Sequence, residues 1–417
     1  MPERVMIVGC WDKKIKEELF QSRMEELASL VYTSGGEVVG TVTQSRPHPD
    51  ARTYIGIGKV EEVKRAIHAC DADAVVFNDE LTPAQVRNLD KEIGIKVIDR
   101  TQLILDIFAQ RAQTREGKIQ VELAQLMYLL PRLAGQGQVL SRLGGGIGTR
   151  GPGETKLETD RRHIQRRMDD LKQQLADIES HRESYRKERR KHHVVQFALV
   201  GYTNAGKSTM LNKLSGSDTF QEDLLFATLD PLTRQITLPS GYPALVTDTV
   251  GFIQDLPTTL IAAFRSTLEE VKEADILLHV VDASHPEVRA QMETVEALLK
   301  ELEVDHLPVI TIYNKMDMVE DPLLLPTDKE PSLRISLLEE KDIYRLLERM
   351  EQVLKDQMTY YAVSVPIADG KAIADIQQYT MVMHEKMAKT TERYEIEGYV
   401  LKEHPVHGTI SKYKMNS

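Results

Sequence analysis

The feature that most constrains the fold is the stretch VVQFALVGYTNAGKST, which runs from Val194 to Thr209. Its first half is a short apolar run with β-branched residues, typical of a buried strand, and it ends at Gly201. From Gly201 the chain fits the pattern G-x-x-x-x-G-K-S/T. At a strand-to-helix junction such a loop binds phosphate, because glycines let successive backbone N–H groups point at a di- or triphosphate. The alternative is an ordinary glycine turn, but a chance match to this pattern is rare directly after a strand and before a helix.

Each residue type in this loop has an expected task. Lys207 is expected to reach the β- and γ-phosphate oxygens and to take part in catalysis. Ser208 is expected to ligate Mg²⁺, and the helix that begins here adds the positive end of its dipole. The expected nucleotide-binding residues of the loop are Gly201, Tyr202, Thr203, Asn204, Ala205, Gly206, Lys207, Ser208 and Thr209.

A second motif, D-x-x-G, begins at Asp248 after the apolar run ALVT. It predicts Asp248 near Mg²⁺ and the Gly251 N–H near the γ-phosphate, where Gly251 counts among the catalytic groups. This motif is common by chance and gains weight only after a phosphate loop.

A third motif, N-K-x-D, follows the strand-like run VITIY and decides the base. The Asp317 carboxylate can accept from both the N1–H and the 2-amino group of guanine, whereas adenine presents an acceptor and no amine there. Asn314 is expected to brace the phosphate loop, and the Lys315 stem to cover the base face. A polar turn is the alternative, but the three motifs in this order predict a protein that binds GTP and GDP.

Composition limits the remaining classes of function. The net charge of −11 argues against general adhesion to nucleic acid, so any such contact needs a local basic surface. The sequence has no apolar run long enough to span a membrane and no signal-peptide pattern, which predicts a cytoplasmic protein without stable membrane insertion. Cys10 and Cys70 form no disulfide framework and are expected to be buried small apolar residues in a reducing compartment.

The 417 residues are enough for roughly three domains. In residues 1–112 strand-like runs alternate with helical stretches, including one that starts at Thr82 and Pro83, which predicts an α/β recognition domain. Residues 193–356 are expected to form the GTPase domain, a mostly parallel sheet with helices on both faces. Residues 357–417 are expected to form a small C-terminal α/β domain of strand, helix and strand, with the helix from Ala372 to Met387.

Residues 113–192 have a different pattern, in which apolar residues recur at spacings of 3, 4 and 7, as in the seam of two paired helices. The seam residues are Ile119, Leu123, Leu126 and Leu130, and later Ile164, Met168, Leu171, Leu175, Ile178 and Tyr185. A long antiparallel helical hairpin explains this pattern. Its arms are interrupted by Pro131 and by a glycine-rich loop at 135–153.

Arginines gather on the loop and on the second arm of this hairpin. Arg142 and Arg150 lie in the loop, and Arg161 and Arg162 lie on the arm. For the arm alone a solvated helix face is an equal alternative, but arm and loop together predict contact with an RNA backbone. A flexible loop without aromatic platforms suits the shape of folded RNA better than base stacking.

The chain resembles the HflX family of ribosome-associated GTPases, which are related to translation factors. The matching stretches are RTYIGIGKVEE, GGGIGTRGPGETKLETDRR, GYTNAGKST, FATLDPLTR, TDTVGFIQDLP and NKMD. The resemblance implies binding of the large ribosomal subunit, GTP turnover that is slow alone and stimulated by ribosomes, and splitting or rescue of stalled ribosomes.

The resemblance also implies that Thr228 of FATLDP is the switch threonine, a catalytic residue that closes on Mg²⁺ and the γ-phosphate. Spacing alone leaves Thr219, Thr228 and Thr233 as equal candidates. In the family the last guanine loop tends to read S-A. Here Ser336 is assigned to that loop although Leu337 follows it.

One departure concerns catalysis. After Gly251, where many GTPases place a water-orienting glutamine, this chain has Phe252. Asn204 lies at the loop position at which cation-dependent GTPases hold K⁺ against the phosphates, so K⁺ is a candidate second cation beside Mg²⁺. The alternative is that Asn204 merely tolerates a tight turn.

Three functions from different classes remain open beside ribosome splitting or rescue. The chain could serve in maturation of a ribosomal subunit, could be a GTP-dependent switch with a protein partner and no RNA, or could bind GTP as a structural ligand. The expected partners are GTP or GDP and the large ribosomal subunit with its RNA, and the expected state is a monomer.

Overall fold

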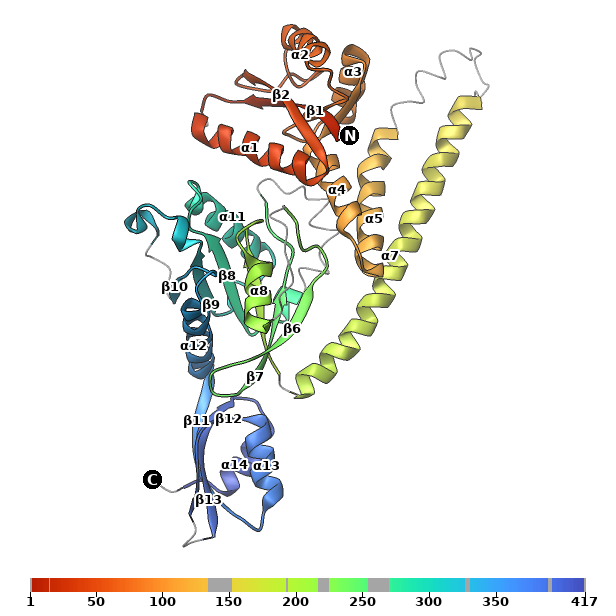
Figure 1. Ribbon diagram of the computed structural model, residues 1–417. Coiled ribbons are helices and arrows are strands. Elements are labelled where there is room, and N and C mark those ends of the chain that lie inside the picture. The colour runs from red at the N-terminus through yellow and green to blue at the C-terminus, as the bar shows by residue number, and fades with distance from the viewer. Residues whose placement is uncertain are drawn as a thin grey trace. The chain divides into compact units, whose positions relative to one another are not determined.

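The computed structural model describes residues 2–14, 16–133, 152–192, 194–216, 225–253, 270–326, 331–388 and 392–415 (Figure 1). The chain divides into two compact units. The first contains the described residues of Met1–Ser180, Glu222–Asp230 and Ile253–Ser266. The second contains those of His181–Gln221, Pro231–Phe252 and Thr267–Ser417.

The first unit begins with a four-stranded parallel sheet in the order β2-β1-β3-β4. Its elements are β1 (Glu3–Trp11), α1 (Glu17–Thr33), β2 (Gly36–Ser45), α2 (Ile57–Cys70), β3 (Ala74–Phe77), α3 (Pro83–Ile93), β4 (Lys96–Asp99) and α4 (Arg100–Arg111). The predicted start of α3 is confirmed, because the Thr82 hydroxyl accepts from the Gln85 N–H and Pro83 opens the helix. The two cysteines are free and partly exposed, so the prediction that they are buried was wrong.

The helical hairpin consists of α5 (Arg115–Leu133) and α7 (Pro152–His192), which run antiparallel and side by side (Figure 1). The predicted seam is present over the described side chains, where Ile119 and Leu123 pack with Met168 and Leu171. Pro131 lies inside α5 and does not interrupt it. Only two residues follow this proline in the helix, so the backbone hydrogen bond that it removes lies in the last turn and the rest of α5 is unaffected. Residues 135–151 of the predicted loop, with Arg142 and Arg150, and the Tyr185 side chain lie outside the described residues. The last two residues of that prediction, 152 and 153, open α7, so the helix begins earlier than predicted.

The GTPase part of the second unit is a six-stranded sheet in the order β10-β9-β8-β5-β7-β6. Its elements are β5 (Val195–Gly201), α8 (Lys207–Ser215), β6 (Leu232–Thr237), β7 (Pro243–Asp248), β8 (Ile276–Asp282), α11 (Val288–Glu301), β9 (Val309–Asn314), two 3-10 turns η1 (Met316–Met318) and η2 (Pro322–Leu324), β10 (Ser332–Arg334) and α12 (Glu340–Gln357). All described pairs are parallel except β6 with β7.

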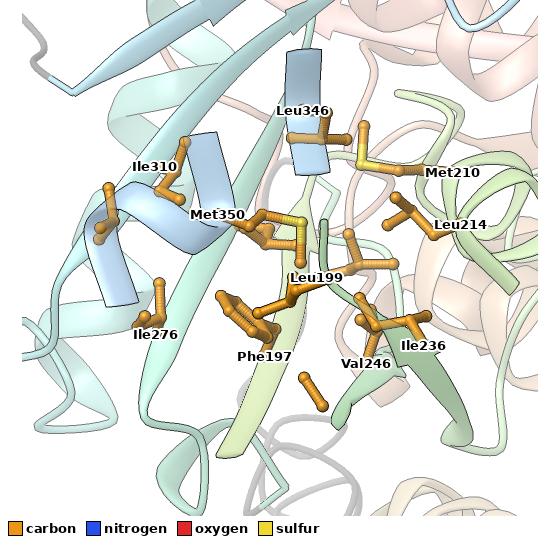
Figure 2. Packing of buried hydrophobic residues seen from close by; sticks show 14 of the residues in the cluster. Phe197, Leu199, Met210, Leu214, Ile236, Val246, Ile276, Ile310, Leu346 and Met350 are labelled. Carbon is orange, nitrogen blue, oxygen red and sulfur yellow. The ribbon is translucent and has the colours of Figure 1, made fainter. Parts of the chain in front are cut away.

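Both faces of this sheet are covered, as expected for parallel strands that are apolar on both sides. On β5, Phe197 and Leu199 face a core to which α8 and α12 contribute Met210 and Met350 (Figure 2). Ala198 and Val200 of the same strand belong to a second core with Val295 and Leu299 of α11. The strand that leads into the phosphate loop is therefore fixed from both sides, and the predicted α/β architecture is confirmed.

The C-terminal part is a three-stranded antiparallel sheet in the order β11-β13-β12 with two helices. Its elements are β11 (Met358–Pro366), α13 (Gly370–Tyr379), β12 (Met381–Ala388), β13 (Arg393–Leu401) and α14 (His407–Lys412). The helix predicted from Ala372 to Met387 was too long, because it ends at Tyr379 and a strand follows. Met, Glu, Lys and Ala favour helix locally, but pairing with β13 decides the conformation.

In the described part of the chain, no helix combines the length and the apolarity that crossing a bilayer requires.

Candidate functional site

The phosphate loop joins the end of β5 to the start of α8, as the motif requires. Gly206 has φ of 97° and Asn204 has φ of 63°, so the loop passes through left-handed backbone conformations. An added Cβ at Gly206 would lie 2.4 Å from the Asn314 amide nitrogen. One at Gly201 would lie 2.2 Å from the Val280 carbonyl oxygen. Both glycines are therefore required by close packing as well as by backbone bending.

Lys207 is the charged centre of this loop. Its Nζ donates to the carbonyl oxygens of Gly201 at 3.0 Å and of Tyr202 at 2.7 Å, and the residue is 6% exposed. Burial lowers the pKa of Lys207 to about 8, and attraction by the Asp248 carboxylate opposes that shift. A buried ammonium held by its own loop can bind anionic oxygens in a low-dielectric site.

Gly251 lies beside this lysine. A Cβ at Gly251 would be 3.0 Å from Lys207 Nζ, so the structure brings the second motif to the first. The backbone of Phe252 locks the two together, because Thr203 N donates to its carbonyl at 2.7 Å and its N–H donates to Gly201 O at 3.1 Å. The Phe252 side chain is buried in the core that contains Val200. The position of the usual glutamine is thus occupied by a core residue.

The candidate Mg²⁺ ligands are oxygen donors at the ends of these elements. Ser208 is the second residue of α8, and Asp248 ends β7 with no exposed surface. A hydroxyl and a carboxylate are the hard donors that Mg²⁺ prefers, so the residues fit the ion. Thr228 lies in the first unit, not in the second. Thr219 lies outside the described residues, and Thr233 is held on β6 by a 2.9 Å contact with the Thr247 hydroxyl.

The third motif lies next to the phosphate loop. Asn314 Nδ2 donates to the Ala205 carbonyl at 2.9 Å, which is the bracing contact that the sequence predicts. Ser336 Oγ donates to Asp317 Oδ1 at 2.6 Å, so the assigned serine touches the residue expected to recognise the base. The Ser336 N–H in turn donates to Asp342 at 2.9 Å.

Two acidic residues of this region were missed from the sequence. Lys315 Nζ pairs with Asp282 at 2.7 Å, and Asp342 fixes the Ser336 backbone. The signal for Asp282 was present, because it ends the buried strand ILLHVVD next to the strand that carries the motif. Asp342 carries no such signal, because it stands among several other acidic residues at the start of α12.

The two predicted RNA-contacting arginines within the described part of the chain, Arg161 and Arg162, are exposed on α7. Arg167 of the same helix is engaged by Glu122 through two contacts of 2.6 and 2.8 Å. This pair belongs to the hairpin itself, so not every arginine of the arm is available to a partner.

Three family models match the chain in succession. They describe a GTP-binding GTPase N-terminal region over residues 21–109, a GTP-binding GTPase middle region over 111–189 and a 50S ribosome-binding GTPase over 196–315.

Curated relatives named GTPase HflX match over most of their length. The protein of Alkalihalophilus pseudofirmus is 53% identical over 410 residues, which are 98% of this chain and 96% of the relative. That of Escherichia coli (strain K12) is 40% identical over 368 residues, 87% of this chain and 86% of the relative. Among solved structures, a GTP-binding protein from the archaeon Sulfolobus solfataricus in complex with GDP is 24% identical with a TM-score of 0.45, covering 84% of this chain and all of that one.

Proposed function

The chain belongs to the HflX family of GTPases, and on that premise we propose that it binds the large ribosomal subunit as a monomer and splits or rescues stalled ribosomes. Its reaction is hydrolysis of GTP to GDP and phosphate. The observation that carries the proposal is the match of the nucleotide-binding region, residues 196–315, to a model described as a 50S ribosome-binding GTPase. We further propose that turnover changes the affinity of the protein for the ribosome.

In the proposed reaction a water molecule attacks the γ-phosphate in line with the leaving oxygen. Lys207 and the Gly251 N–H, which lie close together, stabilise the charge that develops on the phosphate oxygens. Ser208 and Thr228 would hold Mg²⁺ with Asp248 nearby, and the ion supplies neutralisation of the phosphate charge. Asp317 and Ser336 select guanine.

The attacking water needs a partner other than residue 252, because the Phe252 side chain lies in the core. We propose that K⁺ held by Asn204 supplies part of the missing charge neutralisation. The φ of 63° at Asn204 supports the competing role equally, since asparagine tolerates this conformation better than most residues.

Two variants separate these roles. Asn204→Gly keeps the left-handed turn and removes the amide, whereas Asn204→Ala removes the amide and strains the turn. GTP turnover is measured in KCl and in NaCl at equal ionic strength. A K⁺ preference that both variants abolish supports the cation role. A native chain with equal rates in both salts, or a glycine variant that keeps its K⁺ preference, would contradict it.

We propose that Arg161 and Arg162, with Arg142 and Arg150, contact ribosomal RNA. The exposure of Arg161 and Arg162 on α7 supports this interface. The slope of log affinity against log salt is negative. Replacing Arg161 and Arg162 by Gln should reduce its magnitude by about 0.7 to 0.9 for each phosphate that the variant no longer neutralises. Lys172→Gln is a matched control on the same helix, because Lys172 is also exposed. An unchanged slope would leave the arm as a solvated surface.

The proposed partner is tested directly by sedimentation with ribosomes in GDP and in a non-hydrolysable GTP analogue. Comigration with the large subunit that depends on the nucleotide is the expected result. Absence of comigration in both nucleotides would favour a protein partner. Equal binding in both, with no turnover-dependent change in the proportion of split ribosomes, would favour a constitutive or maturation role.

A further inference from the structure

The segment 225–230, here called the switch segment, belongs to the first unit although the motifs around it belong to the second. Three of its apolar residues are buried, with exposures of 9% for Leu225, 2% for Phe226 and 3% for Leu229. Thr228, the proposed switch threonine, lies among them and shares the FATLDP stretch. The segment is therefore part of the unit that does not contain the phosphate loop.

The first anchor of the switch segment is Phe226. Its ring meets the Phe108 ring of α4 edge-on, with centroids 4.7 Å apart and planes at 79°. Its φ is 54°, a conformation that aromatic residues rarely adopt and that the surrounding packing must maintain. Next to it, the Leu225 N–H donates to the Thr33 hydroxyl of α1 at 3.3 Å.

The second anchor is Asp230, whose carboxylate lies at the start of α5. It accepts from the backbone N–H groups of Gln113 and Thr114, both at 2.9 Å, and from the Thr114 hydroxyl. The positive end of the helix dipole adds to these hydrogen bonds. A Cβ at Gly117 would lie 2.3 Å from Asp230 Oδ1, so the absence of a side chain at Gly117 permits this approach.

We infer that the switch segment is a fixed part of the N-terminal unit, so that Thr228 moves only together with that unit. Phe226 and Asp230 are positioning residues, each two residues from Thr228. At about 3.3–3.6 Å per residue, Thr228 stays within about 7 Å of either anchor while both hold. A contact that moves the N-terminal unit therefore moves the switch threonine with it.

Movement as one body is favoured over release of the segment. Release would expose the side chains of Phe226 and Leu229 and would leave the N–H groups at the start of α5 without the carboxylate. A packed interface of this kind has discrete arrangements and does not deform continuously. The inference rests on the assignment of Thr228 made above, and Thr228→Ala separates the two. If that variant keeps native turnover, the assignment fails and the anchoring is not at fault.

The main test is Gly117→Ala in the full chain. The new methyl group displaces the Asp230 carboxylate, whereas alanine itself favours the helix. We expect GTP turnover to fall about tenfold or more, with unchanged GDP affinity, because Thr228 serves only Mg²⁺ and the γ-phosphate. Gly58→Ala is the matched control, since Gly58 also lies in a helix of this unit and a Cβ there meets nothing within 4 Å. Turnover equal to that of the control would overturn the inference.

A disulfide gives the second test. Thr114→Cys with Asp230→Cys, in a chain whose Cys10 and Cys70 are replaced by alanine, removes the anchor when reduced and restores a bond there when oxidised. We expect oxidation to recover most of the turnover that the reduced form has lost. An oxidised form less active than the reduced form would show that the segment must leave the unit.

Discussion

Asp99 in the N-terminal unit and Asp248 in the GTPase part have the same local origin and different uses. Each is the last residue of a buried strand of a sheet, β4 and β7, and each has no exposed surface. Their sequence contexts, KVID and ALVTD, are equally apolar. A carboxylate at the end of such a strand therefore says nothing by itself about function.

The surroundings of Asp99 are those of a structural junction. It accepts from the N–H groups of Leu81 and Gln102, from the Tyr128 hydroxyl at 2.8 Å and from Arg132 at 3.0 Å. The Arg132 guanidinium also lies 3.3 Å from the centre of the Tyr128 ring. Burial and the neighbouring carboxylate raise the pKa of the Tyr128 hydroxyl. The carboxylate joins the sheet to α5 of the hairpin through partners of this chain alone.

Asp248 has a different neighbour, the buried Lys207 ammonium. Attraction by the Asp248 carboxylate raises the pKa of Lys207 and so opposes the effect of burial. Around this pair the chain has glycines, which let Val280, Asn314 and Lys207 approach the backbone closely. The comparison teaches that a buried charge satisfied within the protein serves stability, and that one placed beside a glycine-lined loop serves binding. Variants at the two places should accordingly change different measurements.

The largest expected effect is that of Lys207→Met. GTP turnover should fall by about 10²–10³ or more, the usual cost of removing one donor that stabilises transition-state charge. The melting temperature should fall less than in Asp99→Ala, because the loss of a neighbour for Asp248 is offset by removal of an ammonium that burial disfavours. Lys213→Met on the same helix is the control, since Lys213 is exposed. A variant that loses stability but keeps its turnover would show that the Lys207 and Asp248 site is structural and not catalytic.

Asp99→Ala should have the opposite signature. Removing one partner of a buried ion pair leaves Arg132 uncompensated, and the free energy of unfolding should fall by about 3–5 kcal/mol. GDP affinity should be retained in the folded fraction. Denaturant titration of the variant, with Tyr128→Phe as a milder control at about 1 kcal/mol, measures this. An alanine variant no less stable than the phenylalanine control would show that the junction is not structural.

The motifs were predictable because each is local: the phosphate loop, Gly251 and the N-K-x-D stretch depend on neighbours within a few residues. What could not be predicted depends on tertiary approach. Asp230 meets Thr114 across 116 positions, and no local pattern distinguishes it from a solvated aspartate. The strand β12 was missed for a related reason, because its pairing with β13 outweighs the helix propensity of its residues.

A smaller effect is expected at the base. In Asp317→Asn, a carboxylate that only accepts hydrogen bonds is replaced by an amide that both accepts and donates. The affinity for GTP should fall by about 10- to 100-fold, the worth of a hydrogen bond to a charged group. Affinity for xanthine nucleotides should rise. Ser336→Ala removes only the 2.6 Å contact to Asp317 and should bring no xanthine preference. Competition binding with both nucleotides gives the result, and unchanged GTP affinity in the asparagine variant would remove Asp317 from the base site.

The smallest expected effect is a pH dependence at Lys207. Its pKa of about 8 means that the ammonium loses its proton as the pH rises through 8. GTP affinity should therefore decline above pH 8, by at most about tenfold per pH unit. Stability changes in the opposite direction, because between pH 8 and the ordinary lysine pKa of 10.5 the unfolded chain binds more protons than the folded one. The contribution of this lysine to the free energy of unfolding thus rises over that window.

Lys207→Arg distinguishes this titration from others, since a guanidinium stays charged throughout the range. Whatever affinity the arginine variant retains, its decline between pH 7.5 and about 9 should be flatter than that of the native chain. The comparison uses slopes and not absolute affinities, because arginine differs from lysine in shape. Parallel slopes would assign the proton to the guanine base or to another group. In that case attraction by the Asp248 carboxylate would keep Lys207 charged throughout this pH range in spite of its burial.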